Sequence, residues 1–188
     1  VRYSNKIAHA YRNKYDGYVL NSGFKENSAN AMIGLNRSWG YSHLHLSAYR
    51  IMPGIVEGER DSLTGQFLKP VLVNGEEGFE VAGHSDFYSY SQQIPYQDVN
   101  HYKAVLNNSF LIGKSTLKAT IGWQQNRRKE FADVSAPDQY GLYFYLNTIN
   151  YDAKYILPVY KGLNLSFGVN GMQQSSQNRG TEFLVPEY

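Results

Sequence analysis

The sequence contains no cysteine, which excludes disulfide scaffolds, thiolate zinc sites and thiol nucleophiles. Charge is also scarce, because Asp, Glu, Lys and Arg make up 18% of the 188 residues and the formal net charge is +2. The longest basic run is Arg127-Arg128-Lys129, so the electrostatic footprint of a nucleic-acid-binding protein is missing. No stretch approaches the roughly 20 apolar residues of a membrane helix, and the first residues lack the apolar centre of a signal peptide.

Aromatic residues, by contrast, reach 15% of the chain and include 17 tyrosines. A disordered chain would be poor in aromatics and rich in charge, so a folded domain is indicated. The first residues read as the middle or end of a strand. We therefore expect residues 1–188 to be a single segment of a longer protein.

Residues 99–131 predict a long hairpin that turns at Gly113-Lys114. In each half, apolar and polar side chains alternate with the period of two that gives a strand one apolar and one polar face. The expected apolar faces carry Tyr102, Ala104, Leu106, Phe110, Ile112, Leu117, Ala119, Ile121 and Trp123. Val105 and Leu111 interrupt the polar face of the first strand.

The same alternation predicts further strands over residues 1–11, 29–39, 41–51, 142–157 and 163–175, with a tight turn at Gly40. No helical periodicity competes with it. Long connections are expected at 12–27 and 52–98, the latter with a small hairpin at Asn74-Gly75. A medium one is expected at 132–141, and a polar, strandless stretch at the C-terminus. Long and short connections therefore alternate.

These patterns predict an all-β fold: an antiparallel up-and-down meander of long strands with its long loops at one end. The runs cover about 11 to 16 residues, whereas strands of soluble sandwiches average about five or six. A tilted membrane-spanning strand needs roughly 9 to 11 residues, with one lipid-facing apolar side and aromatic girdles at both interfaces. Tyr143 and Tyr145 stand near one end of a strand, and Tyr151 and Tyr155 toward the other. The favoured architecture is therefore a section of a transmembrane β-barrel.

Gly122-Trp123-Gln124-Gln125-Asn126-Arg127-Arg128-Lys129-Glu130-Phe131 resembles a strand end of TonB-dependent outer-membrane receptors of Bacteroidota-type bacteria. Leu146 through Tyr155 and the closing Phe183-Leu184-Val185-Pro186-Glu187-Tyr188 are similar to later segments of that family, and Trp39-Gly40 and Met52-Pro53-Gly54 fit the same pattern. The resemblance implies a bacterial outer-membrane transporter with roughly 22 strands and a plugged lumen. It also implies uptake of a ferric siderophore or similar nutrient, powered through TonB. The segment would contact outer-membrane lipid and lacks the plug domain.

Ligand contacts are expected from the two long loops, where cations accompany aromatic rings suited to an anionic, aromatic iron chelate. The candidates are Arg12, Lys14, Tyr15 and Tyr18 in the first loop, and Arg60, His84, Phe87, Tyr88 and Tyr90 in the second. Such tyrosines could equally serve only to pack the loops together. No cofactor, metal site or catalysis is expected. His43 and His45 lack a visible third ligand, and His84-Ser85-Asp86 lacks a nucleophile-elbow context.

A soluble all-β ligand- or carbohydrate-binding module is the alternative. The two hypotheses differ in where Leu117, Ile121, Tyr151, Leu165 and Phe167 lie. A membrane barrel requires these residues on one outward face, whereas a soluble sandwich would bury them between two sheets.

Overall fold

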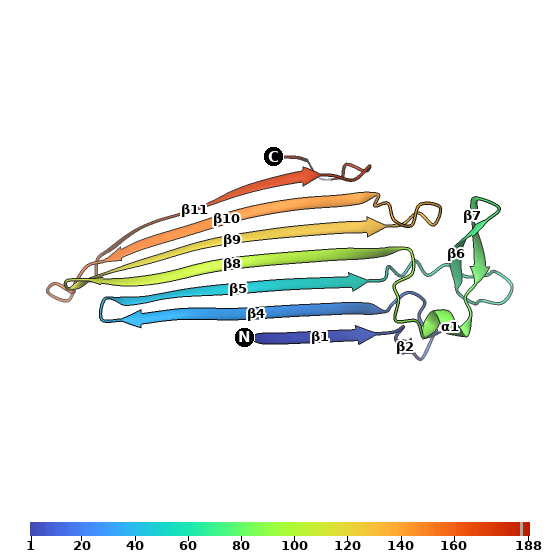
Figure 1. The fold of residues 1–188 in the computed structure, drawn as a ribbon, viewed down its shortest axis with the longest axis horizontal. Coiled ribbons are helices and arrows are strands. Elements are labelled where there is room, and N and C mark those ends of the chain that lie inside the picture. The colour runs from blue at the N-terminus through green and yellow to red at the C-terminus, as the bar shows by residue number, and fades with distance from the viewer. Residues whose placement is uncertain (185) are drawn as a thin grey trace.

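One long antiparallel sheet dominates the computed structural model, which describes residues 1–184 and 186–188. Its seven strands follow each other in chain order, so the predicted meander is confirmed (Figure 1). They are β1 (Arg2–Ala8), β4 (Phe24–Arg37), β5 (Gly40–Pro53), β8 (Tyr96–Ile112), β9 (Ser115–Phe131), β10 (Leu142–Ile156) and β11 (Ser166–Asn178). The sheet is open, with β1 at one edge and β11 at the other.

The central hairpin forms as predicted. Ile112 pairs with Ser115 across Gly113-Lys114, and 17 residues on each side are strand. Gly113 has a φ of +59°, the left-handed conformation that two-residue hairpin turns require and that glycine adopts without a steric penalty. The turn therefore fixes the register of the two longest strands.

The neighbouring hairpin differs from the prediction at both ends. Its turn is Ser38-Trp39, because Gly40 already pairs with Arg37 as the first residue of β5. At the other end β4 begins at Phe24, so the loop predicted over 12–27 was too long. The sequence there is polar, but β1 pairs with it along its length, and Lys6 forms a 2.9 Å ion pair with Glu26.

The last strand also lies later than predicted. Leu163 and Leu165 belong to the connection before β11, and Ser176–Asn178, expected in a strandless tail, complete the strand. Polar cross-strand bonds support this end, such as that from Gln174 Nε2 to Thr148 Oγ1 at 3.0 Å. Tyr188 then exchanges two backbone hydrogen bonds with Ser176, so the chain folds back along β11. Val185, within the closing stretch similar to the receptor family, lies outside the described residues.

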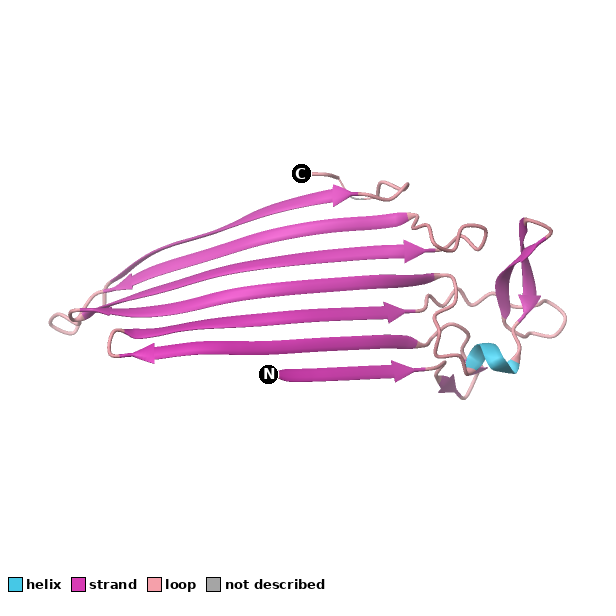
Figure 2. Cartoon of the chain, in the orientation of Figure 1, coloured by secondary structure: helices cyan, strands magenta, loops and turns pink. Residues whose placement is uncertain are grey.

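Small elements gather with the long connections at one end of the sheet (Figure 2). They are β2 (Arg12–Asn13), β3 (Gly17–Tyr18), β6 (Leu68–Val73), β7 (Glu76–Val81) and the one-turn helix α1 (His84–Phe87). The predicted hairpin at Asn74-Gly75 is confirmed, with φ of +52° and +88° at the two turn residues. α1 was not predicted, since four residues are too few for helical periodicity. Among the described residues, no helix has the length and apolar character to cross a membrane.

Register aligns apolar residues across the sheet into continuous rows. Ile33, Leu44, Leu106, Ile121 and Tyr151 are successive cross-strand partners on five strands. Side chains two residues apart share a face, so further rows lie beside this one. We call this side the apolar face; its members are Ala31, Ile33, Leu35, Leu44, Leu46, Ala48, Ala104, Leu106, Phe110, Leu117, Ala119, Ile121, Trp123, Ile149, Tyr151, Ala153, Tyr155, Phe167 and Val169.

The apolar face is exposed. Ile33 keeps 66% of its surface accessible, Ile121 51% and Phe167 64%. Within residues 1–184 and 186–188, every strand longer than six residues belongs to the one sheet, so no second sheet covers this face. Of the discriminating residues, Leu117, Ile121, Tyr151 and Phe167 share the face, while Leu165 precedes β11 and is 53% exposed.

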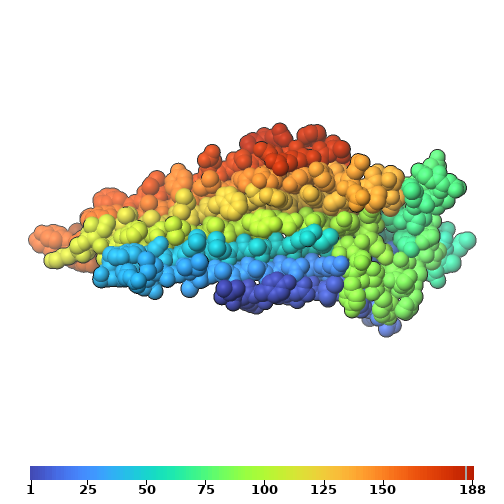
Figure 3. Space-filling model, viewed as in Figure 1, coloured from blue at the N-terminus to red at the C-terminus, as the bar shows by residue number. Residues whose placement is uncertain are grey.

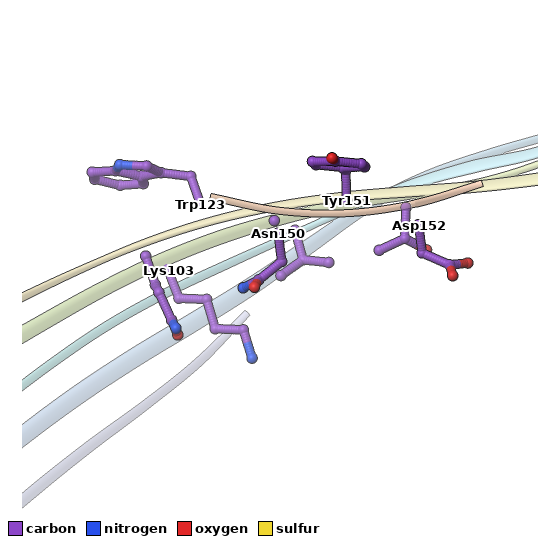
Figure 4. A pocket seen from close by; sticks show the side chains of 9 residues that line it. Lys103, Trp123, Asn150, Tyr151 and Asp152 are labelled. Carbon is purple, nitrogen blue, oxygen red and sulfur yellow. The ribbon is translucent and has the colours of Figure 1, made fainter. Parts of the chain in front are cut away.

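The opposite face is polar. Figure 4 shows Lys103, Asn150 and Asp152 on one side of the strands and Trp123 and Tyr151 on the other. These residues line one hollow of about 230 Å³ near Gly122. Because the sheet itself separates the two groups, they do not enclose a common cavity. The hollow is a shallow depression where Gly122 contributes no side chain.

Candidate functional site

The long loops form a compact body of their own at the end of the strands (Figure 3). Its small core consists of Val19, Leu20 and Phe67, which are 4%, 7% and 6% exposed, with Ala82 and Phe87 packed against them. Residues from loop 12–22 and from the excursion between β5 and β8 thus share one core. A loop of that length usually is functional when it is ordered.

Hydrogen bonds to backbone carbonyls attach this body to the strands. The Ala10 amide donates to the Phe87 carbonyl at 3.2 Å. The Asn21 side-chain amide donates to the carbonyls of Ile55 at 3.0 Å and Pro95 at 2.6 Å, at the two roots of the excursion. These bonds place α1 against the end of β1.

Five aromatic rings meet on this body, and we call them the loop aromatic cluster: His9, Tyr18, His84, Tyr88 and Tyr90. His9 lies 5.2 Å from Tyr88, 5.6 Å from Tyr90 and 6.1 Å from Tyr18, measured between ring centroids. His84 stacks on Tyr88 at 4.3 Å. Such centroid distances are those of favourable aromatic pairs.

A hydroxyl pair joins two of these rings. The Tyr88 hydroxyl donates to the Tyr18 hydroxyl at 2.9 Å. This bond, more than burial, raises the pKa of Tyr88 above its ordinary value. Tyr88 and Tyr90 remain 39% and 51% exposed. The cluster therefore offers ring surface and hydroxyl groups to a ligand arriving from the loop end.

Two cations accompany the cluster in different ways. The Arg12 guanidinium lies 5.7 Å from the Tyr18 ring centroid, and within the described chain it forms no ion pair. Arg60 is 3.9 Å from the Phe67 ring centroid and makes a 2.6 Å ion pair with Asp16. Arg12 is thus available to an anion, whereas Arg60 is largely occupied in packing the loops.

The structure therefore brings together Arg12, Tyr18, His84, Tyr88 and Tyr90 of the predicted set. Arg60 contacts this group only indirectly. Its guanidinium lies over the Phe67 ring, and the Phe67 ring is 6.2 Å from that of Phe87, which neighbours Tyr18. Lys14 lies over the Tyr15 ring at 4.9 Å, but no ring contact joins this pair to the cluster in the described part of the chain. His9 was missed, because a strand was expected over residues 1–11 and β1 ends at Ala8.

Asp86 is the main polar anchor of α1. One carboxylate oxygen accepts from Lys69 Nζ at 3.0 Å and Gln93 Nε2 at 3.1 Å, and the other accepts from the Gly83 amide at 2.8 Å. Lys69 also contacts Glu80 at 2.8 Å. Hydrogen bonds to Glu80 and Asp86 outweigh burial and raise the pKa of Lys69. This network ties the β6–β7 hairpin to α1, the helix that Tyr88 directly follows.

Replacing Asp86 by Ala is expected to loosen the loop body while leaving the sheet intact. Three hydrogen bonds disappear, each with a typical net contribution of about 0.5–1.5 kcal/mol, so local stability falls by about 1.5–4.5 kcal/mol. Limited proteolysis would show this as faster cleavage between residues 54 and 95. Glu80→Ala is the matched control, since Glu80 is 55% exposed and supports a single ion pair. Equal cleavage of both variants would contradict the anchoring role.

His43, on the polar face, has ordinary partners. His43 Nε2 lies 2.8 Å from Asn36 Oδ1, and its ring stacks on Tyr41 at 4.6 Å. Within residues 1–184 and 186–188, no three His, Asp or Glu side chains are grouped closely enough to hold a metal ion.

Comparisons with known proteins return no matching family model, no matching curated protein and no matching solved structure.

Proposed function

We propose that this chain is a segment of the transmembrane β-barrel of a TonB-dependent outer-membrane receptor, acting in transport and not in catalysis. The observation that carries the proposal is the exposed apolar face, which runs across the strands without a covering layer. Burial of apolar surface stabilises a protein by about 25 cal/mol per Å², and an exposed face lacks this stabilisation. Lipid around a barrel would remove this face from water, with the polar face directed to a wet lumen.

The open edges support the same proposal. The outer sides of β1 and β11 present backbone groups that invite pairing with further strands, and Tyr188 already hydrogen-bonds to β11. In a closed barrel, additional strands would complete both edges, and the plug domain and TonB would act through the complete receptor. The soluble alternative would need another layer over the apolar face and lacks an observation in its favour.

The loop end is where we place ligand recognition, for a ferric siderophore or a similar nutrient. The loop aromatic cluster offers stacking surface, and Arg12 offers an unpaired positive charge beside it. A ferric catecholate is both aromatic and anionic, which suits stacking and charge together. A ferric hydroxamate lacks the aromatic rings and is expected to bind less well.

Tyr88→Ala is expected to weaken binding of a ferric catecholate to the outer-membrane-inserted protein by roughly two- to tenfold. The estimate is the loss of one aromatic contact, about 0.5–1.5 kcal/mol. Quenching of tryptophan fluorescence during titration would measure it. Tyr15→Ala is the control, because Tyr15 is 84% exposed and stands apart from the cluster. Equal losses in both variants would contradict the assignment of the cluster, and a protein that is soluble and absent from outer-membrane fractions would contradict the proposed function.

A further inference from the structure

A second group of tyrosines and cations lies beyond the apolar face, on the same side of the sheet, where β9 and β10 approach the loops. Arg127 follows Trp123 by four residues in β9, and Tyr145 precedes Ile149 by four in β10. Even spacing along a strand keeps side chains on one face. We call this group the outer cationic belt; its members are Tyr102, Gln125, Arg127, Lys129, Tyr140, Tyr143, Tyr145 and Arg179.

Buried hydrogen bonds hold the centre of the outer cationic belt. Gln125 is only 7% exposed, and its amide nitrogen donates to the Tyr145 hydroxyl and to Asn147 Oδ1. Its amide oxygen accepts from Arg127 Nε at 2.7 Å. The Arg127 guanidinium then lies 5.8 Å from the Tyr102 ring centroid and 5.2 Å from that of Tyr145. Among the described residues, Arg127 uses one of its five N–H donors in a hydrogen bond, the one to Gln125.

The other two cations repeat this arrangement. Arg179 lies 4.0 Å from the Tyr145 ring centroid and hydrogen-bonds to Gln177 Oε1 through two nitrogens. Lys129 Nζ is 4.9 Å from the ring centroids of both Tyr140 and Tyr143. All three positive groups are therefore fixed on aromatic rings.

The positive charge of the outer cationic belt is not balanced by carboxylates. Asp98 is the cross-strand partner of Lys129, but its two oxygens bond to Arg50, at 2.9 and 2.8 Å, and to Asn100. Within the part of the chain that the structure describes, no carboxylate oxygen lies within 4.0 Å of the charged nitrogens of Arg127, Lys129 or Arg179. Three fixed cations thus stand next to an apolar surface without a protein counter-ion.

We propose that the outer cationic belt binds the anionic, phosphate-bearing headgroups of membrane lipids in preference to zwitterionic ones. This inference rests on the proposed function, which places the apolar face against lipid acyl chains. The belt then lies at headgroup depth, where tyrosine rings are favoured. A guanidinium can bind phosphate oxygens through two parallel hydrogen bonds. Each cation near an anionic membrane surface contributes roughly a fivefold preference for anionic over neutral lipid. Three cations together therefore give a preference of roughly a hundredfold.

The test compares lipid binding by the full chain and its variants in detergent. Phosphatidylglycerol, phosphatidylcholine and inorganic phosphate are titrated at equal ionic strength, and bound molecules are counted by native mass spectrometry. Arg127→Gln/Lys129→Gln/Arg179→Gln is expected to lose roughly a hundredfold of the preference for phosphatidylglycerol over phosphatidylcholine. Lys103→Gln/Lys118→Gln/Lys154→Gln removes the same charge from the polar face and should retain the preference. Arg127→Lys/Arg179→Lys keeps the charge and should retain most of it.

Each other outcome overturns the inference. Equal losses in both glutamine triple variants would mean that net charge alone attracts the lipid. Saturable binding of inorganic phosphate without lipid would mean a site for free anions. Outer-membrane fractionation of the wild type is measured in parallel. A protein that inserts but shows no lipid preference contradicts only this inference, whereas a protein that does not reach the outer membrane contradicts the proposed function.

Discussion

In the proposed barrel, Ile121→Arg is expected to destabilise the protein in lipid by about 2–4 kcal/mol, because a cation would then stand on the proposed lipid face near the bilayer midplane. Ile121 is central in the row that joins β4, β5, β8, β9 and β10, and it is 51% exposed on the apolar face. Chemical unfolding of the full chain in phospholipid vesicles, followed by tryptophan fluorescence, would measure the change. A lower yield of folded protein in the outer membrane should accompany it.

Thr120→Arg is the matched control for this substitution. Thr120 is adjacent in β9, but its side chain points to the polar face, where Oγ1 donates to Asn107 Oδ1 at 3.0 Å and Asp152 is its cross-strand partner. The added guanidinium there meets water and a carboxylate, so only one hydrogen bond is lost, at about 0.5–1.5 kcal/mol. If both variants lose the same stability, the two faces do not meet different solvents and the barrel proposal fails.

The strands were predictable because alternation is a local signal. Apolar residues at Leu117, Ile121 and Trp123 predict one face of β9 from the sequence alone, and Gly113 predicts its turn. The antiparallel order followed from the alternation of long and short connections. Strand ends were harder to place, because β4 begins in polar residues that β1 pairs with, and cross-strand pairing cannot be seen in one strand's sequence.

The candidate site was predictable in kind but not in detail. Tyrosines and cations in long loops indicate a binding surface, and five of the predicted residues do meet. The meeting itself depends on contacts between segments far apart in sequence, such as the Tyr88–Tyr18 hydrogen bond across 70 positions. His9 entered the cluster because β1 ends one residue before it. The outer cationic belt was missed for a similar reason, since Arg179 joins Tyr145 only once β11 is in register.

Gly40, the first residue of β5, is expected to be indispensable for stability. From the sequence alone it was expected to form the tight turn before this strand. Gly40 has a φ of +128°, a conformation that L side chains rarely adopt, and an added Cβ would overlap the Ser109 carbonyl oxygen of β8. Gly40→Ala should therefore combine a backbone cost and an overpacking cost of about 1–3 kcal/mol each, or about 2–6 kcal/mol in all. Chemical unfolding in vesicles would measure it.

Gly113→Ala is the comparison variant, because it places alanine at a positive φ without an overpacking cost. Gly113 also has a positive φ, at +59°, as the first residue of the turn between β8 and β9, but an added Cβ there meets open space. Only the conformational cost of about 1 kcal/mol is then expected. A larger loss is expected for Gly40→Ala, because a φ of +128° is less accessible to alanine than one of +59° and because the added Cβ would overlap the backbone of β8. Equal losses would contradict the close approach of β5 to β8 and would leave the register of these two strands to their side chains alone.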